Sequence, residues 1–173
     1  MSISYAGIGS RNCPDHVSSF IIAVSQYLAS RGFILRSGGA DGCDNAFEQG
    51  CDLASGAKEI FIPWAGFNGR QYLDFNIAKA SLIAKQYHPR YTELSFGAQK
   101  LMNRNSCQVL GANLDNPVKF IICYTPNGSG SGGTGQALRI AKANNIPIFD
   151  IGKYAYISSA STALKQFLRE LNL

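Results

Sequence analysis

Charged residues are scarce in this sequence. They make up 16% of its 173 residues, whereas hydrophobic residues make up 46%. Disordered chains combine low hydrophobicity with high net charge, so this composition excludes extensive disorder and predicts a single folded domain over residues 1–173. Lys and Arg number 16 against 11 Asp and Glu, and the resulting net charge of +5 favours anionic partners.

Long apolar runs are also absent. No run reaches the roughly 20 residues that a helix needs to cross a bilayer. The first residues, MSISYAGIGSR, lack the basic segment and long apolar stretch of a secretion signal. We therefore expect a soluble, cytoplasmic protein without a membrane partner.

Clusters of metal ligands are missing as well. The five cysteines are odd in number and contain no CxxC pair, and the two histidines, His16 and His88, stand far apart in the sequence. Zinc sites and disulfide frameworks need grouped residues of these types. We expect no metal and no cofactor, and we expect the cysteines to be reduced and not catalytic.

The sequence does contain a regular alternation of short apolar runs, small-residue turns and amphipathic segments. This alternation predicts an α/β fold: a doubly wound, Rossmann-like, mostly parallel sheet with helices on both faces. The expected strands are residues 3–8, 33–36, 59–62, 119–124 and 147–151. The expected helices are residues 14–32, 43–54, 75–86, 92–110, 135–144 and 159–171.

Three of the strand-to-helix turns are built from small residues. They contain, in chain order, Gly9, Ser10 and Arg11; Gly38, Gly39, Asp41 and Gly42; and Gly132, Gly133, Thr134 and Gly135. In an open parallel sheet such turns lie at the ligand-binding edge, with the first and third expected on either side of a topological switch point. Glycine lets backbone N–H groups approach an anion, and a helix N-terminus favours negative charge. The turns predict a phosphate site, although each could also be a tight connection alone.

Three arginines accompany these turns. Arg11 follows the first turn, Arg104 lies among amides in an amphipathic helix, and Arg70 lies in a loop with Trp64 and Phe67. A guanidinium can hold a phosphate through two hydrogen bonds, so we expect all three arginines to contact a ligand. The alternatives are a surface salt bridge for Arg11 and a subunit interface around Arg104. The two aromatic rings could stack a base or pack onto the sheet.

Three carboxylates lie within and directly after the second turn at helical spacing. Asp41, Asp44 and Glu48 share one face if the helix begins near Asp41. Acidic residues at this position often cap a helix, and that is one interpretation of Asp41. The functional alternative makes Asp44 or Glu48 a catalytic group at a glycosidic carbon.

Several segments together resemble a known family. They are YAGIGSRNCP, LRSGGADGCDNAFEQG, IPWAGFNGR, HPRYTELSFGAQKLMNRNSCQVLG and ICYTPNGSGSGGTGQALRIA. They resemble a DprA-like family common in bacteriophages, within the Rossmannoid superfamily of DNA processing protein A and the Lonely Guy phosphoribohydrolases. The resemblance spans residues 5–148. It implies a nucleotide-derived ligand with phosphates against the second and third turns. It also implies a homo-oligomer, with residues 75–110 as the candidate interface, and a location in the host cytoplasm if a phage encodes the protein.

One departure from the superfamily affects the expected activity. The Lonely Guy pattern ends in a catalytic glutamate, and Arg139 stands at that position here. Three functions therefore remain open, and with them whether the protein is an enzyme. The first is binding of an ADP-ribose-like molecule or other nucleoside phosphate, which could sequester a host defence signal. The second is N-glycosidic hydrolysis or transfer, and the third is single-stranded DNA binding through Arg70 and Arg104.

Overall fold

The computed structural model describes residues 3–173, which contain a five-stranded parallel sheet. Its strands are β1 (Ser4–Gly9), β2 (Ile34–Ser37), β3 (Lys58–Ile60), β4 (Phe120–Tyr124) and β5 (Ile148–Asp150). Their order is β3-β2-β1-β4-β5, and every neighbouring pair is parallel. The predicted doubly wound α/β fold is confirmed.

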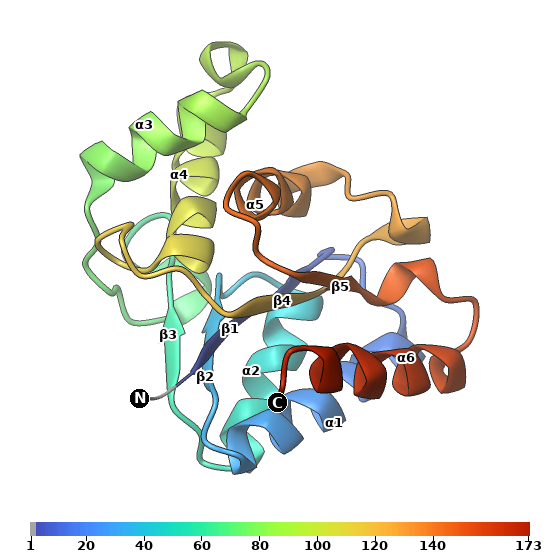
Figure 1. Ribbon diagram of the computed structural model, residues 1–173. Coiled ribbons are helices and arrows are strands. Elements are labelled where there is room, and N and C mark those ends of the chain that lie inside the picture. Colours follow the sequence, from blue (N-terminus) through green and yellow to red (C-terminus); the bar gives the residue numbers. More distant parts are fainter. Residues whose placement is uncertain (1–2) are drawn as a thin grey trace.

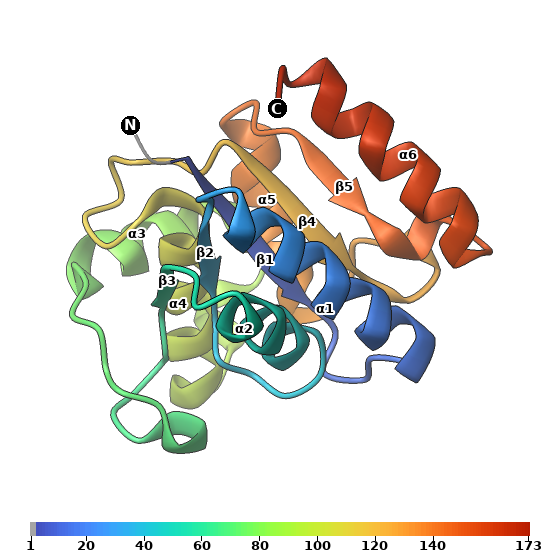
Figure 2. The ribbon, with the colours of Figure 1, turned by 90° about the horizontal axis from the view of Figure 1, so that it is seen from below.

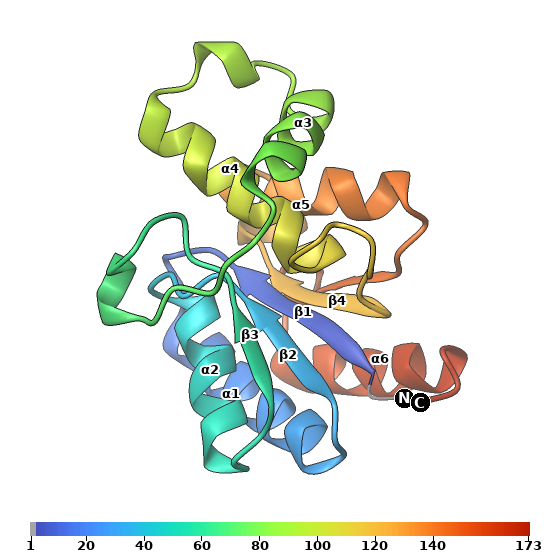
Figure 3. The same ribbon diagram turned by 90° about the vertical axis from the view of Figure 1, so that its left-hand side faces the viewer.

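Helices cover both faces of the sheet (Figure 1). One face carries α1 (Asp15–Ser30), α2 (Cys43–Leu53) and α6 (Ile157–Glu170), and the other carries α3 (Ile77–Tyr87), α4 (Phe96–Leu110) and α5 (Gly132–Ala143). Alternate residues of a strand point to opposite faces. In β4, Phe120 and Ile122 accordingly join the apolar core under α1, while Ile121 and Cys123 join the core under α5. Figure 3 shows these two layers from the β3 edge.

Some predicted boundaries differ from the observed ones. Helix α4 begins at Phe96 rather than Thr92, because Ser95 caps it by accepting a hydrogen bond from the Ala98 N–H at 3.3 Å. A 3-10 turn, Tyr91–Glu93, occupies the preceding residues. Helix α5 begins at Gly132, earlier than the predicted Gly135. The remaining elements lie within two residues of their predicted limits.

The strand order places a crevice between β1 and β4. The chain leaves β1 toward β2 through α1 on one face, and leaves β4 toward β5 through α5 on the other face (Figure 2). The loops after these two adjacent strands therefore diverge, and the sheet edge between them stays open.

Two further findings concern the residues that the structure describes. None of their helices is long and apolar enough to cross a membrane, and none of their Cys, His, Asp and Glu side chains form a group of three suited to a metal ion. All five cysteines are free, and four of them are buried.

Candidate phosphate-binding site

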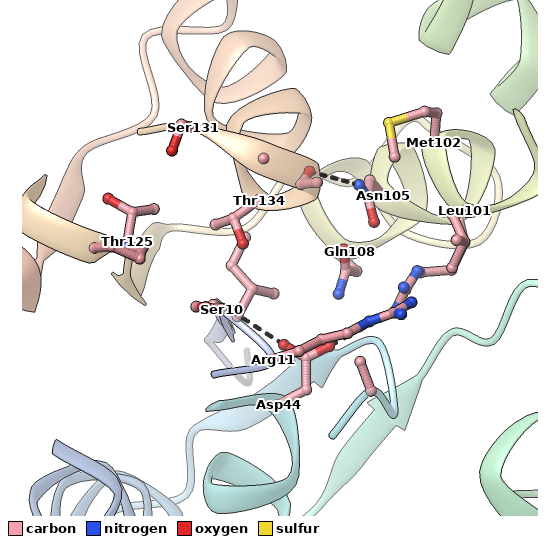
Figure 4. A pocket seen from close by; sticks show the side chains of 17 residues that line it. Ser10, Arg11, Asp44, Leu101, Met102, Asn105, Gln108, Thr125, Ser131 and Thr134 are labelled. Carbon is pink, nitrogen blue, oxygen red and sulfur yellow. Dashed lines mark hydrogen bonds and ion pairs between the residues drawn. The ribbon is translucent and has the colours of Figure 1, made fainter. Parts of the chain in front are cut away.

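A cavity of about 440 Å³ opens at the carboxyl ends of β1 and β4. Figure 4 shows its walls: Ser10 and Arg11 after β1, Asn105 and Gln108 on α4, and Thr134 on α5. The fold thus brings the first and third small-residue turns to one cavity, although most of the chain separates them in sequence.

Backbone hydrogen bonds fix the turn after β1. The Ser10 N–H donates to the Tyr124 carbonyl at 3.0 Å, and the Ser10 carbonyl accepts from the Cys43 N–H at 3.1 Å. The turn is thereby held between the end of β4 and the start of α2. The exposed Arg11 side chain lines the cavity and pairs with no acidic group in residues 3–173. Its guanidinium is free to hold an anion.

Arg104 and Asp44 form a buried ion pair in the cavity wall. Their side chains are 6% and 5% exposed, and Arg104 Nη1 lies 3.6 Å from Asp44 Oδ2. Arg104 Nη1 also donates to the Gly38 carbonyl, and Asp44 Oδ1 accepts from the Gly9 N–H at 3.1 Å. In contrast, the Arg104 Nε–H is buried and has no acceptor in residues 3–173. A buried donor without a partner is unfavourable, so the hydrogen-bonding groups of Arg104 are not fully satisfied within residues 3–173.

The wall of the cavity carries more positive than negative charge. Burial raises the pKa of Asp44 to about 6, against the opposing effects of Arg104 and the Gly9 N–H. Burial lowers the pKa of Arg104; Asp44 opposes this shift and the nearby Arg11 adds to it. At neutral pH two cationic groups therefore lie close to one carboxylate, and an anion is the complement of such a wall.

The N-terminus of α5 adds backbone donors. Gly132, Gly133 and Thr134 form its first turn and line the cavity, and Ser131 before them makes no side-chain cap. The N–H groups of these three residues have no acceptor in residues 3–173. Donors at the start of a helix are suited to bind an anion. Asn105 Nδ2 donates to the Gly133 carbonyl at 2.9 Å and so fastens α4 to this turn.

A carboxylate behind the cavity was missed by the sequence analysis. Asp150, at the end of β5, accepts hydrogen bonds from the Thr125 N–H at 3.0 Å and from the Thr125 hydroxyl. Thr125 Oγ1 in turn accepts from the Gly130 N–H at 2.9 Å. This network holds the segment between β4 and α5 in place. Gly135 lies under that segment, where a Cβ would collide with the Gly130 carbonyl, and it does not line the cavity.

The turn after β2 is filled by side chains of the protein itself. A Cβ at Gly38 would collide with Arg104 and Gln108, and a Cβ at Gly39 would collide with Arg70. The fold therefore does not bring Gly38 and Gly39 to the cavity wall. The glycines permit the close approach of the protein's own guanidinium groups.

The rest of that turn lies apart from the cavity as well, except for Ala40. Gly42 has a φ of 77° and packs against the backbone of Arg11, so both the left-handed conformation and the contact require glycine. Asp41 precedes α2 and is exposed. It therefore does not share the buried helix face of Asp44, contrary to the expectation from spacing.

Glu48 and Arg70 bind each other rather than lining the cavity. Arg70 Nε donates to Glu48 Oε1 at 2.7 Å, and Arg70 Nη2 donates to Asn45 Oδ1 at 3.2 Å. Lys58 Nζ lies 3.7 Å from Glu48 Oε2. These contacts fasten the loop after β3 to α2. The structure places both residues outside the cavity.

Comparisons with known proteins agree with this architecture. No protein-family model and no curated protein matches the sequence. DNA processing protein A from Helicobacter pylori matches the structure with a TM-score of 0.51 at 16% identity, over 86% of this chain and 64% of that one. The same protein from Streptococcus pneumoniae matches with 0.54 at 17% identity, over 86% and 50%. The Moco carrier protein of Chlamydomonas rheinhardtii matches with 0.56 at 15% identity, over 97% and 98%.

The chain shares their Rossmannoid fold. It spans 64% and 50% of the two DNA processing protein A chains, but nearly the whole Moco carrier protein.

Arg139 takes part in helix packing. It donates from Nε to the Tyr87 carbonyl at 2.9 Å and from Nη2 to Gln136 Oε1 at 2.8 Å. It fastens α5 to α3. Asp44 is the one carboxylate among the described residues that line the cavity.

Proposed function

We propose that the protein binds a nucleotide-derived molecule, through its phosphates, in the cavity between β1 and β4. The observation that carries the proposal is the exposed guanidinium group of Arg11, which lines the cavity and pairs with no acidic group in residues 3–173. The first N–H groups of α5 supply further donors, which suits the several oxygens of a diphosphate. Leu101 and Met102 add apolar surface for the base or sugar.

The ligand is bound and not converted. Asp44, the carboxylate of the cavity, is already engaged by Arg104 and the Gly9 N–H. The name of the Moco carrier protein describes carriage of a small molecule on the same fold. An intact ADP-ribose-like ligand held in this way would be withdrawn from other proteins of the cytoplasm, and a host defence signal would be sequestered by such binding.

The first test measures binding of ADP-ribose by calorimetry. Replacement of Arg11 by alanine is expected to weaken binding about tenfold to a hundredfold, because one charge-assisted contact is lost. Thermal stability should stay unchanged, since Arg11 pairs with no acidic group in residues 3–173. Arg169→Ala, which removes a cation from α6 far from the cavity, is the matched control. Equal affinities of the parent and the Arg11 variant would refute the phosphate site.

N-glycosidic hydrolysis or transfer is the second candidate, for one reason. Asp44 faces the cavity with a pKa of about 6, which suits proton donation to a leaving base. Mass spectrometry of ADP-ribose and NAD after incubation with the protein tests it. Release of free base that stops in Asp44→Asn would establish turnover, whereas intact nucleotide would leave binding as the function.

Single-stranded DNA binding is the third candidate, because the Helicobacter pylori neighbour is described as a single-stranded DNA-binding protein. Oligonucleotide affinity should then fall by about 0.7 log units per log unit of salt for each phosphate contacted. Affinity that does not vary with salt would count against this function.

Assembly into a homo-oligomer through α3 and α4 also belongs to the proposal. Ile77, Leu82 and Phe96 on these helices are 57%, 70% and 75% exposed, which is unusual for large apolar side chains. Light scattering of the purified protein gives the particle mass that decides the question.

A further inference from the structure

A second, smaller cavity lies apart from the phosphate-binding site. It has a volume of about 190 Å³ and lies between the segment after β3, the start of α3 and α4. Pockets for whole small molecules usually measure about 300 to 1,000 Å³, so this one has room for a single ring system. Trp64, Tyr72 and Phe75 supply aromatic walls, and Lys100 and Asn103 supply polar groups.

Asn103 presents an unused donor to this cavity. Its side chain belongs to a residue that is only 8% exposed, and its Oδ1 accepts a hydrogen bond from the Tyr91 hydroxyl at 2.7 Å. The Tyr91 hydroxyl also lies 3.2 Å from Ser81 Oγ, which can donate to it. This chain of bonds fixes the orientation of the amide. Asn103 is one of the residues that line the cavity, and its Nδ2 group donates no hydrogen bond to another group in residues 3–173.

The aromatic walls are held in place by their neighbours. Trp64 is 39% exposed and contacts Phe67 edge to face, with ring centroids 5.2 Å apart and an interplanar angle of 88°. Tyr72 packs against Phe75 at 6.0 Å. The indole is therefore held by this contact and remains partly exposed, and an exposed aromatic ring offers a stacking surface for a flat ring.

We propose that this cavity binds a nucleobase, stacked on the aromatic side chains and accepting a hydrogen bond from Asn103 Nδ2 through a carbonyl oxygen or ring nitrogen. The half-buried Lys100 lies at the same cavity, with Nζ 4.5 Å from the Phe96 ring centroid, and adds positive charge for a phosphate attached to the base. The base can belong to a free nucleotide or to an unpaired single strand. The inference does not rest on the phosphate-binding site.

The chain offers a specific reporter for this cavity. Trp64 is its single tryptophan, so intrinsic tryptophan fluorescence reports on this wall alone. Titration with thymidine and with a short oligothymidylate is expected to change the fluorescence saturably, whereas ribose 5-phosphate, which has no base, should not. A response to both thymidine probes assigns the site to a free base, and a response to the oligonucleotide alone assigns it to a single strand. No response to these probes or to cytidine, adenosine and guanosine would overturn the proposal.

Two variants separate recognition from folding. Asn103→Asp keeps an oxygen for the Tyr91 hydroxyl but replaces the free amide donor, so thymidine or oligothymidylate affinity should fall about tenfold. Trp64→Ala, measured by calorimetry, should weaken binding by about the same factor through lost stacking and tests the site even if the aspartate variant does not fold. Tyr27→Ala removes a 53% exposed aromatic side chain on α1 and should change nothing. Unchanged binding in both cavity variants would overturn the proposal, while Arg11→Ala should leave the tryptophan signal intact even if the phosphate-binding site fails its own test.

Discussion

The turn after β2 and the turn that begins α5 look alike in sequence but differ in what fills them. Both combine serine and paired glycines at the carboxyl edge of the sheet. At Gly38 the space that a side chain would take is occupied by Arg104 and Gln108, whereas at Gly133 the nearest atom is Met102 Cε at 3.9 Å. The same glycine pattern thus admits the protein's own guanidinium group at one turn and leaves open space at the other.

The largest effect is expected when Arg104, the arginine that fills the turn after β2, is removed. Arg104→Met leaves Asp44 buried without its cation, which should lower the free energy of unfolding by about 3 kcal/mol at about pH 8. The double variant with Asp44→Asn should recover most of this loss, because no uncompensated charge remains. Urea unfolding of the three proteins measures both values. An Arg104→Met variant as stable as the parent would show that the pair is not part of the folded core.

A methyl group added at each turn should have different effects on stability and ligand affinity at the two turns. Gly38→Ala forces the buried Arg104 aside and is expected to destabilise the protein by about 2 kcal/mol. Gly133 lies in a helix next to open space, so the free energy of unfolding of Gly133→Ala should equal that of the parent or exceed it by up to about 1 kcal/mol. The ADP-ribose affinity of this variant should fall about tenfold, because the methyl group narrows the cavity. Unfolding curves and calorimetry provide the two readings.

Gly97→Ala is the matched control for these substitutions. It also lies in a helix, and no atom lies within 4 Å of its added Cβ. Its ligand affinity should equal that of the parent protein. Its free energy of unfolding should rise only by the gain expected when alanine replaces glycine in a helix, to within a few tenths of a kcal/mol. If Gly38→Ala behaved like this control, the proposed filling of the turn after β2 would be wrong.

The smallest effect is expected from pH. The pKa of Asp44 is raised to about 6, so its carboxyl group is negative above this pH and becomes neutral below it. Removal of a negative charge from the wall favours an anion, and ADP-ribose affinity should rise about fivefold from about pH 8 to about pH 5. The diphosphate of ADP-ribose does not titrate in this interval. Asp44→Asn should abolish the dependence, and an affinity that instead fell on acidification would contradict this assignment.

Much of the fold could be predicted because its signals are local. Buried parallel strands are short apolar runs, and amphipathic helices repeat with a period of 3.6 residues, so each element could be recognised from its own residues. The start of α5 was missed because glycine is a poor helix former, and only the contact from Asn105 to the Gly133 carbonyl shows how that turn is held. The role of Asp150 was missed because an acidic residue at a strand end has no distinctive spacing.

The order of residues sufficed to predict the parallel sheet, its switch point and the small-residue turns at the carboxyl ends of its strands, because periodicity and turn chemistry are properties of neighbouring residues. Which of those turns remains open was decided by tertiary packing. Arg104 reaches the Gly38 carbonyl across 66 positions, and Arg70 reaches Glu48 across 22. Such pairings depend on where helices and loops lie on the sheet, because a guanidinium group can bind any carboxylate or carbonyl group that lies within reach in the folded chain.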